Sequence, residues 1–261
     1  MLIRSLKVAA LAAAVLLTTG PTGQAAGEAR HPRDAHFHFA GVFGTFDRAA
    51  AQRGLQVYLQ VCAACHSMHL LSYRNLLELG LSETEVRAIA ATAEVTDGPN
   101  DEGQMFQRPA RLSDRFRRPF ANDAAARSAN NGALPPDLSV ITKARHDGPN
   151  YVYSLLTGYG QEPPADMVMG DGMNYNPYFP GGQIAMGQVL NDDQLEYADG
   201  TNATADQMAR DVTTFLAWAA EPELEARRRM GIRVLIFLGI AGVLAYMVKK
   251  RIWADLKPKA A

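Results

Sequence analysis

The sequence predicts an all-α exported domain with long loops, held to a membrane by one C-terminal helix. Three observations support this class: a basic-then-apolar N-terminus, two internal stretches with helical spacing of apolar residues, and a long apolar run near the C-terminus. Between the two ends lie roughly 200 residues, which is enough for one domain with its own core.

The first residues, 1–26, predict a cleaved secretory signal peptide. Arg4 and Lys7 precede an apolar stretch over 8–17, and small residues follow it. This stretch is too short to cross about 30 Å of hydrocarbon, which disfavours the alternative of an N-terminal anchor. The mature chain is therefore expected to begin outside the cytoplasm.

A second apolar run covers residues 230–248 and ends in the basic cluster 249–251. As a helix this run extends about 28 Å, enough to span a bilayer core. Being apolar on all sides, it does not suit the alternative of a buried core helix in a soluble protein. We predict an external domain over 27–226, a transmembrane anchor over 227–249 and a cytoplasmic tail over 250–261.

Basic residues also flank the run on its outer side, at 227–229, so the orientation rests on the signal peptide rather than on charge. The formal net charge of −1 hides an asymmetry: the external domain carries −11 and the last segment +8. Such an acidic domain repels nucleic acid and anionic lipid and attracts cationic partners. A basic protein partner is expected.

Both cysteines of the chain lie in the stretch VCAACHSMH, as Cys62 and Cys65, and His66 follows at once. A closed zinc site needs four ligands, and two would have to come from distant histidines. A thiol-redox pair usually follows a strand in a βαβ unit, which is not indicated here. Covalent attachment of a c-type haem requires two thiols at this spacing and an adjacent histidine to bind the iron. This pattern predicts one covalent c-type haem.

The residues around the motif favour helices. In the stretch 46–66, Gly54, Tyr58 and Cys62 recur at four-residue steps, and Asp47 is a candidate N-cap. A glycine on this face allows close approach of a second helix. The expected partner is the stretch 203–223, whose apolar stripe at helical spacing predicts a core helix.

A second axial ligand would close the iron site and make it an electron carrier. Met68 and His69 lie too near His66 to reach the other haem face, so packing is their better interpretation. His31, His36 and His38 are expected at the surface or an interface. The remaining candidates are Met105, His146, Met167, Met169, Met173 and Met186. Four of them lie in the Gly-, Pro- and Asn-rich loop 166–194, and the residues alone do not choose among these four.

Beyond CAACH, several separate segments carry a resemblance to a known family: 41–69, 96–116, 129–159 (with NNGALPPDLS), 176–186 (NPYFPGGQIAM), 211–223 and 227–233, before the apolar helix. In these segments, in this order, the chain resembles the cytochrome c1 family of bacterial type, the membrane-anchored haem subunits of cytochrome bc1 complexes. The resemblance covers almost all of the mature sequence and implies a cytochrome c-type haem domain.

The resemblance also implies roles for individual residues. Met186 would be the distal iron ligand opposite His66, and His/Met ligation raises the potential relative to His/His. Arg145 and Tyr151 would bind a haem propionate. The macrocycle would be bordered by Asn130, Leu134, Pro135 and Pro136. Some bacterial members carry a disulfide that steadies the ligand loop; this chain has no cysteine left for one, so packing and hydrogen bonds are expected to hold its loop.

The implied function is electron relay within ubiquinol:cytochrome c oxidoreductase, in a dimeric complex of the inner membrane with the haem domain in the periplasm. The chain would take an electron from the Rieske iron-sulfur protein and pass it to a soluble c-type cytochrome, beside cytochrome b, and would be no enzyme by itself. Two acidic clusters are candidate docking sites for a basic cytochrome: Asp97, Asp101 and Glu102, and Asp192, Asp193, Glu196 and Asp199. The alternative is a membrane-tethered haem peroxidase or gas sensor with an open iron site, and a non-haem metal-binding domain is a third hypothesis.

Overall fold

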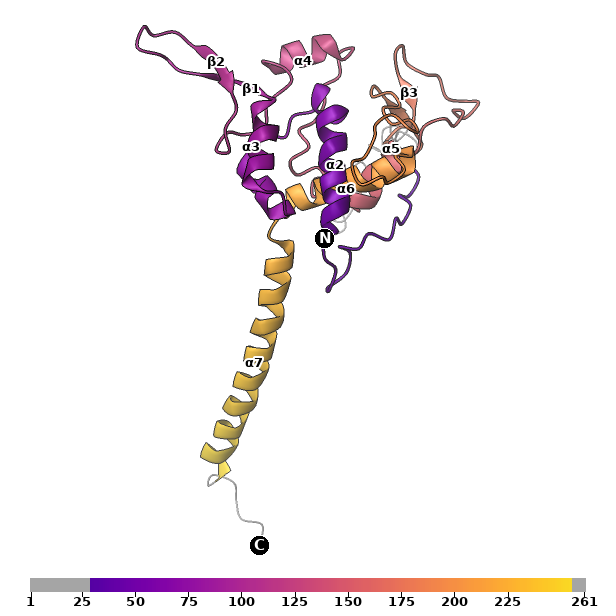
Figure 1. Ribbon diagram of the computed structural model, residues 1–261. Helices are drawn as coiled ribbons and strands as arrows, with labels where there is room; N and C mark the ends of the chain where they lie inside the picture. Colours follow the sequence, from indigo (N-terminus) through magenta and orange to yellow (C-terminus); the bar gives the residue numbers. More distant parts are fainter. Residues whose placement is uncertain (1–28, 255–261) are drawn as a thin grey trace, which may run out of the picture. The chain divides into compact units, whose positions relative to one another are not determined.

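The computed structural model describes residues 29–254 (Figure 1). The predicted signal peptide 1–26 lies outside the described residues, as does most of the predicted tail, 255–261. The described chain forms two compact units, one made of 29–31 with Gly158–Gly187, the other of Pro32–Thr157 with 188–254.

The larger unit contains most of the elements: α2 (Arg48–Gln60), η1 (Cys62–Ala64), η2 (Tyr73–Leu79), α3 (Glu83–Ala91), β1 (Glu94–Asp97), β2 (Phe106–Pro109), α4 (Asp123–Ala129), α5 (Gly148–Leu156), α6 (Ala205–Ala220) and α7 (Leu224–Ile252). The smaller unit contains β3 (Asn174–Tyr175) and β4 (Gln183–Ile184). The chain is helix-rich, as predicted. The all-α class is incomplete, however, because β1–β2 and β3–β4 form two antiparallel pairs.

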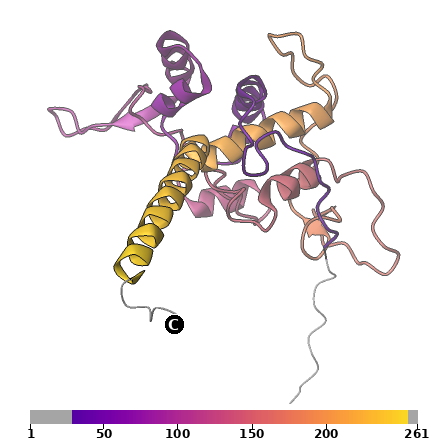
Figure 2. The same cartoon turned by 90° about the horizontal axis from the view of Figure 1, so that it is seen from below.

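Helices α2 and α6 form the centre of the larger unit and cross steeply (Figures 1 and 2). The Asp47 side chain caps α2 by accepting from the Ala50 amide at 3.1 Å, as predicted. The crossing occurs at Gly54, where an added Cβ would lie 2.0 Å from the Asp211 carbonyl oxygen of α6. The predicted close approach of these two helices is confirmed. Cys62 does not continue the helical face, because α2 ends at Gln60 and a 3-10 turn begins at Cys62.

Substitution of Gly54 by alanine is expected to destabilise the domain by about 3 kcal/mol. The new methyl group would collide with backbone, which cannot rotate away, and this cost exceeds the roughly 1 kcal/mol that alanine gains in a helix interior. Thermal unfolding followed by circular dichroism measures the effect. Gly239→Ala in α7 is the matched control, since nothing lies within 4 Å of its added Cβ. A Gly54→Ala protein that unfolds at or above the parental temperature would contradict this packing.

An ion pair joins the same two helices. Arg53 of α2 donates from Nε and Nη2 to the Asp211 carboxylate of α6 at 2.9 and 3.0 Å. The Asp211 side chain is only 1% exposed, so the charge is buried together with its partner. A third bond, from Arg53 Nη1 to Asp199 at 2.8 Å, ties the loop before α6 to the same guanidinium. These bonds fix α2, and with it the segment that follows α2.

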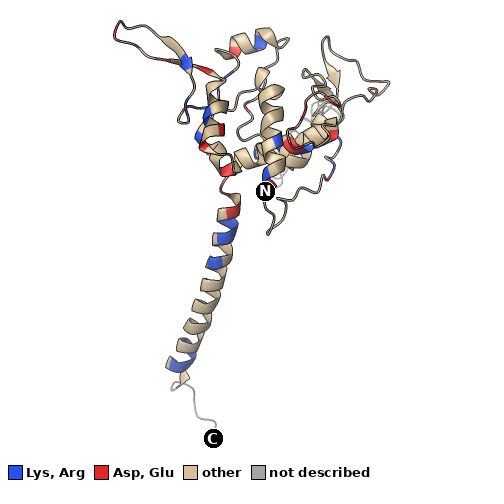
Figure 3. Ribbon diagram, in the orientation of Figure 1, with Lys and Arg blue, Asp and Glu red and all other residues tan. Residues whose placement is uncertain are grey.

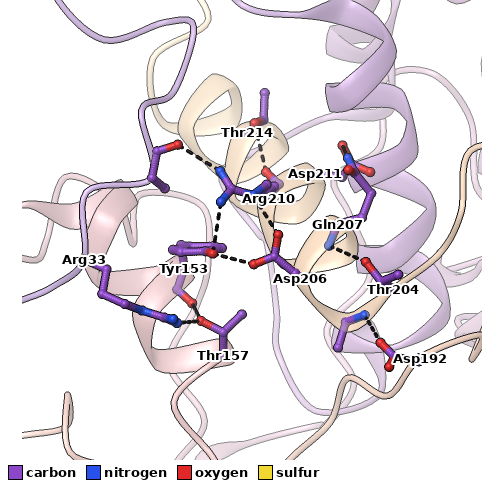
Figure 4. A network of polar contacts seen from close by, with 12 residues as sticks. Arg33, Tyr153, Thr157, Asp192, Thr204, Asp206, Gln207, Arg210, Asp211 and Thr214 are labelled. Carbon is purple, nitrogen blue, oxygen red and sulfur yellow. Dashed lines mark hydrogen bonds and ion pairs between the residues drawn. The ribbon is translucent and has the colours of Figure 1, made fainter.

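Figure 4 shows a second polar network, which joins the N-terminal segment, α5 and α6. Arg210 of α6 pairs with Asp206 at 2.8 Å, and it donates to the Tyr153 hydroxyl of α5 at 3.1 Å and to the Ala35 carbonyl at 2.9 Å. Tyr153 also donates to Asp206. The network therefore holds three segments that are distant in sequence around one guanidinium.

Helix α7 is long, and its apolar side chains are exposed along its length. It is the one helix among the described residues that is long and apolar enough to cross a membrane. Basic residues lie at both of its ends (Figure 3). Its first turn is attached to the larger unit, because Leu224 is buried there and Arg228 bonds to the segment before α2.

Candidate functional site

The two cysteines and His66 lie in one tight turn directly after α2. The amides of Cys65 and His66 both donate to the Cys62 carbonyl, at 3.1 and 2.9 Å. Cys62 is partly buried and Cys65 is exposed, and the two are not joined in a disulfide. Tyr58 of α2 donates from its hydroxyl to the His66 carbonyl at 3.3 Å. The turn is thus closed by its own backbone and fixed to α2.

The His66 imidazole is oriented by a residue 70 positions away. Its Nδ1 lies 2.8 Å from the Pro136 carbonyl oxygen. Because a carbonyl only accepts, Nδ1 carries the proton and donates, which leaves the lone pair of Nε2 free. Burial lowers the pKa of His66, so the ring is neutral at pH 7. A neutral imidazole whose second nitrogen donates to a carbonyl is the state in which histidine binds a metal.

The surroundings of the cysteines do not favour a thiol-redox or zinc centre. Burial raises the pKa of Cys62 to about 12, whereas a reactive redox thiol has a lowered pKa. Within residues 29–254, no three histidine, cysteine or acidic side chains gather into a possible metal cluster. Two thiols and one neutral imidazole on a single turn do fit a haem attached through both cysteines.

A carboxylate connects the segment after His66 to the segment after Pro136. Asp137 Oδ2 accepts from Ser67 Oγ at 2.6 Å and from the His69 amide at 2.9 Å. It also pairs with His69 Nδ1 at 2.6 Å, while Oδ1 accepts from the Ser139 amide at 2.9 Å. Burial opposes ionisation, but these bonds outweigh it and hold the pKa of Asp137 well below its ordinary value. The carbonyl that orients His66 therefore belongs to a clamped segment.

This role of Asp137 was not predicted from the sequence, because its partners Ser67 and His69 lie about 70 positions away. Its position directly after Pro136 was the one feature of the sequence that could have indicated this role. Met68 is fully buried in the core, as its packing role predicted. His69, also expected to pack, instead forms the ion pair with Asp137.

The structure brings two further predicted residues together. Burial raises the pKa of Tyr151, and the neighbouring Arg145 opposes this shift by charge and hydrogen bonding. Arg145 is exposed and pairs with no carboxylate in the described part of the chain. Arg145 and Tyr151 are thus placed to bind one anion jointly.

The other predicted border residues surround Pro136 in sequence. Asn130 ends α4, and its side chain donates to the Ala126 carbonyl at 2.7 Å. Leu134 is 38% exposed, which is high for a leucine in a domain with a formed core. Among the predicted haem-border residues, Pro136 contacts His66 through its carbonyl oxygen. Their contact with a haem remains a prediction.

Met186 lies in the smaller unit, two residues after the end of β4 at Ile184. Its carbonyl accepts from the Tyr159 hydroxyl at 2.9 Å. Gln183 holds the loop from both sides, accepting from the Gly170 amide at 2.7 Å and donating to the Val168 carbonyl at 3.0 Å. Hydrogen bonds therefore hold the loop that carries Met186, as expected for a loop without a disulfide.

Two of the other methionines of the loop, Met167 and Met173, pack inside it. An added Cβ at Gly182 would lie 2.8 Å from Met167 Cε, and one at Gly170 would lie 3.1 Å from Met173 Cγ. Both glycines therefore leave room for a methionine side chain. Met105 belongs to the turn between β1 and β2 and is 60% exposed. These placements favour packing for Met167 and Met173, and the choice of Met186 as ligand stays a prediction.

A CxxCH turn with an oriented imidazole, in a helix-rich domain that continues into one apolar helix, defines a membrane-anchored c-type cytochrome. The model of the cytochrome C1 family matches residues 37–256. The chain belongs to this family.

Curated relatives agree with the match. "Cytochrome c1 1, heme protein, mitochondrial" of Arabidopsis thaliana is 55% identical over 219 residues, which is 84% of this chain and 71% of the relative. "Cytochrome c1, heme protein, mitochondrial" of Saccharomyces cerevisiae is 52% identical with the same coverage. "Cytochrome b-c1 complex catalytic subunit, mitochondrial" of Candida albicans is 51% identical over 87% of this chain and 79% of its own length.

Proposed function

We propose that the chain is the haem-bearing electron-transfer subunit of a cytochrome bc1 complex. The observation that carries the proposal is the His66 ring, held by Pro136 with its Nε2 free, beside two thiols on the same turn. The bound haem c supplies a reversible one-electron couple at its iron. Cys62 and Cys65 would hold it covalently, and His66 and Met186 would bind its iron. No substrate bond is made or broken by this chain.

The surroundings of the site support relay rather than catalysis. Arg145 would pair with a propionate and Tyr151 would donate a hydrogen bond to it, which lowers the cost of burying that charge. The clamped 136–139 segment and the hydrogen-bonded ligand loop keep both ligands in place, so little reorganisation accompanies a change of charge on the iron. An electron arrives from a Rieske iron-sulfur protein and leaves to a soluble c-type cytochrome.

The proposal implies a location for each segment of the chain. The mature domain over 27–226 faces the periplasm, the anchor over 227–249 crosses the inner membrane beside cytochrome b, and the tail over 250–261 lies in the cytoplasm. The assembly is a dimer of such complexes. The mitochondrial relatives support a membrane complex of this kind.

The acidic clusters are smaller than the sequence suggests. Asp97 pairs with Arg108, and Asp199 pairs with Arg53 at 2.8 Å. Asp192 caps α6 by accepting from the Ala205 amide at 2.8 Å. The exposed carboxylates left for a basic partner are Asp101, Glu102, Asp193 and Glu196. These four are the proposed steering charges.

The salt dependence of electron transfer tests the relay. In the purified complex, oxidation of this haem by a basic soluble c-type cytochrome is expected to slow several-fold between low and physiological ionic strength, since exposed charges are screened. Asp193→Asn with Glu196→Gln should flatten that dependence, whereas Glu83→Gln on α3 should not. Equal salt slopes in all three proteins would reject this surface. Failure of quinol to reduce the haem in the intact complex would reject the relay itself.

A further inference from the structure

Two large apolar side chains are exposed in the turn that precedes α2. Val42 is 68% exposed and Phe43 is 83% exposed, at the tip of residues 41–44, here called the Val42–Phe43 turn. Gly41 adopts φ +74°, a left-handed conformation that favours glycine. An added Cβ at Gly44 would lie 2.2 Å from the Ala40 carbonyl oxygen. Both glycines are needed for the tight reversal that places the two apolar residues at its tip.

The turn stands on a buried aromatic base. Phe39 and Phe46 flank it in sequence and are both buried, with ring centroids 5.1 Å apart. Phe37 stacks on the other side of Phe39 at 5.0 Å. The aromatic residues around the turn therefore enter the core, whereas Val42 and Phe43 point away from it.

The turn is also tied to the first turn of α7. Arg228 Nη1 donates to the carbonyls of Phe39 and Gly44 at 2.9 and 2.6 Å, one on each side of the tip. Glu225 accepts from the Phe46 amide at 2.9 Å and pairs with Arg48 at 3.3 Å. Figures 1 and 2 agree, showing the indigo segment before α2 close to the beginning of α7. The position of the turn is thus set by α7.

This attachment determines the depth of the turn in a membrane. Arg228 lies two residues before Met230, where the apolar run begins, and two helical residues correspond to about 3 Å along the axis. The base of the turn is therefore tied close to the point where the apolar run begins. Aromatic and aliphatic residues are favoured at this level. The arginines at 227, 229 and 233 place positive charge at the same level, where anionic headgroups lie.

We propose that the Val42–Phe43 turn inserts into the boundary between headgroups and acyl chains on the side of the haem domain. With α7 it makes a second membrane contact, which limits the tilt of the domain about a single helix. The proposal rests on the membrane span of α7 and is independent of the haem ligands.

A spin label at position 43 tests the insertion. Phe43→Cys creates one labelling site in the full-chain holoprotein, because the haem occupies both native cysteines. The protein is placed in vesicles of phosphatidylcholine and phosphatidylglycerol, and the accessibility of the label to oxygen is compared with that to a water-soluble nickel complex. The expected oxygen-to-nickel ratio is several-fold above that of a label at Phe106 on β2 and below that of a label at Leu238 in α7.

Each control distinguishes a different failure. A ratio at position 43 equal to that at 106 overturns the insertion. A water-like ratio at 238 shows instead that α7 does not span the membrane. In the assembled complex, a label at 43 that is immobile and shielded from both reagents means that a protein subunit covers the turn, which also overturns the proposal.

Discussion

Replacing Met186 with leucine is expected to open one axial position of the haem iron, so that the reduced protein binds carbon monoxide and its potential falls. Leucine has nearly the volume of methionine, and such a swap usually costs less than about 1.5 kcal/mol, so the fold should survive. It lacks the thioether that favours the reduced iron. Visible spectra with and without carbon monoxide, together with a redox titration, measure both effects.

Met173→Leu is the matched control, because Met173 lies in the same loop and packs at Gly170. It should leave the spectrum and the potential unchanged. If Met186→Leu were indistinguishable from the parent in both readouts, the ligand would be another residue. Met105, Met167 and Met169 would then be tested in the same way.

Replacing Asp137 with alanine is expected to lower the stability of the haem domain by about 3 kcal/mol, because several hydrogen bonds to one charged acceptor are lost. The segment carrying the Pro136 carbonyl is then no longer tied to Ser67 and His69. The His66 ring should become less ordered, and the potential should shift. Chemical denaturation and redox titration of the holoprotein check the two results.

Asp137→Asn keeps one oxygen acceptor and the side-chain shape, so it should recover part of the stability. Asp101→Ala removes an exposed carboxylate in the turn between β1 and β2, and it should change neither quantity. An unchanged denaturation midpoint in Asp137→Ala would show that the clamp does not hold the two segments. A lowered denaturation midpoint with an unchanged redox potential would show that Asp137 stabilises the fold but does not influence the haem iron through His66.

The helical framework was predictable because its signals are local. The Asp47 cap, the small residue at Gly54 and the apolar stripe of α6 each follow from helical geometry, and all three are confirmed. The CxxCH turn is equally local, since it lies within five residues. The end of α2 at Gln60 was missed because a 3-10 turn continues the chain with nearly the same spacing.

The rest of the site depends on pairings that no local pattern encodes. Contact between His66 and Pro136, and the clamp at Asp137, join segments about 70 residues apart. The two hairpins are too short for a clear alternation of apolar and polar residues. The pairing of Asp97 with Arg108 and of Asp199 with Arg53 could not be predicted without knowing where the two arginines lie in the fold. The residues of the candidate site could therefore be predicted from the sequence, but the partners that hold them could not.

The central claim is that Cys62 and Cys65 hold one haem whose iron is closed by two protein ligands. Its most direct test is the visible spectrum of the purified, dithionite-reduced full chain, recorded before and after addition of carbon monoxide and again after denaturation. The haem is expected to stay with the denatured polypeptide, and carbon monoxide is expected to leave the native spectrum unchanged. Rapid carbon monoxide binding by the native protein would indicate an open-iron enzyme or sensor, and a polypeptide without covalent haem would contradict the account altogether.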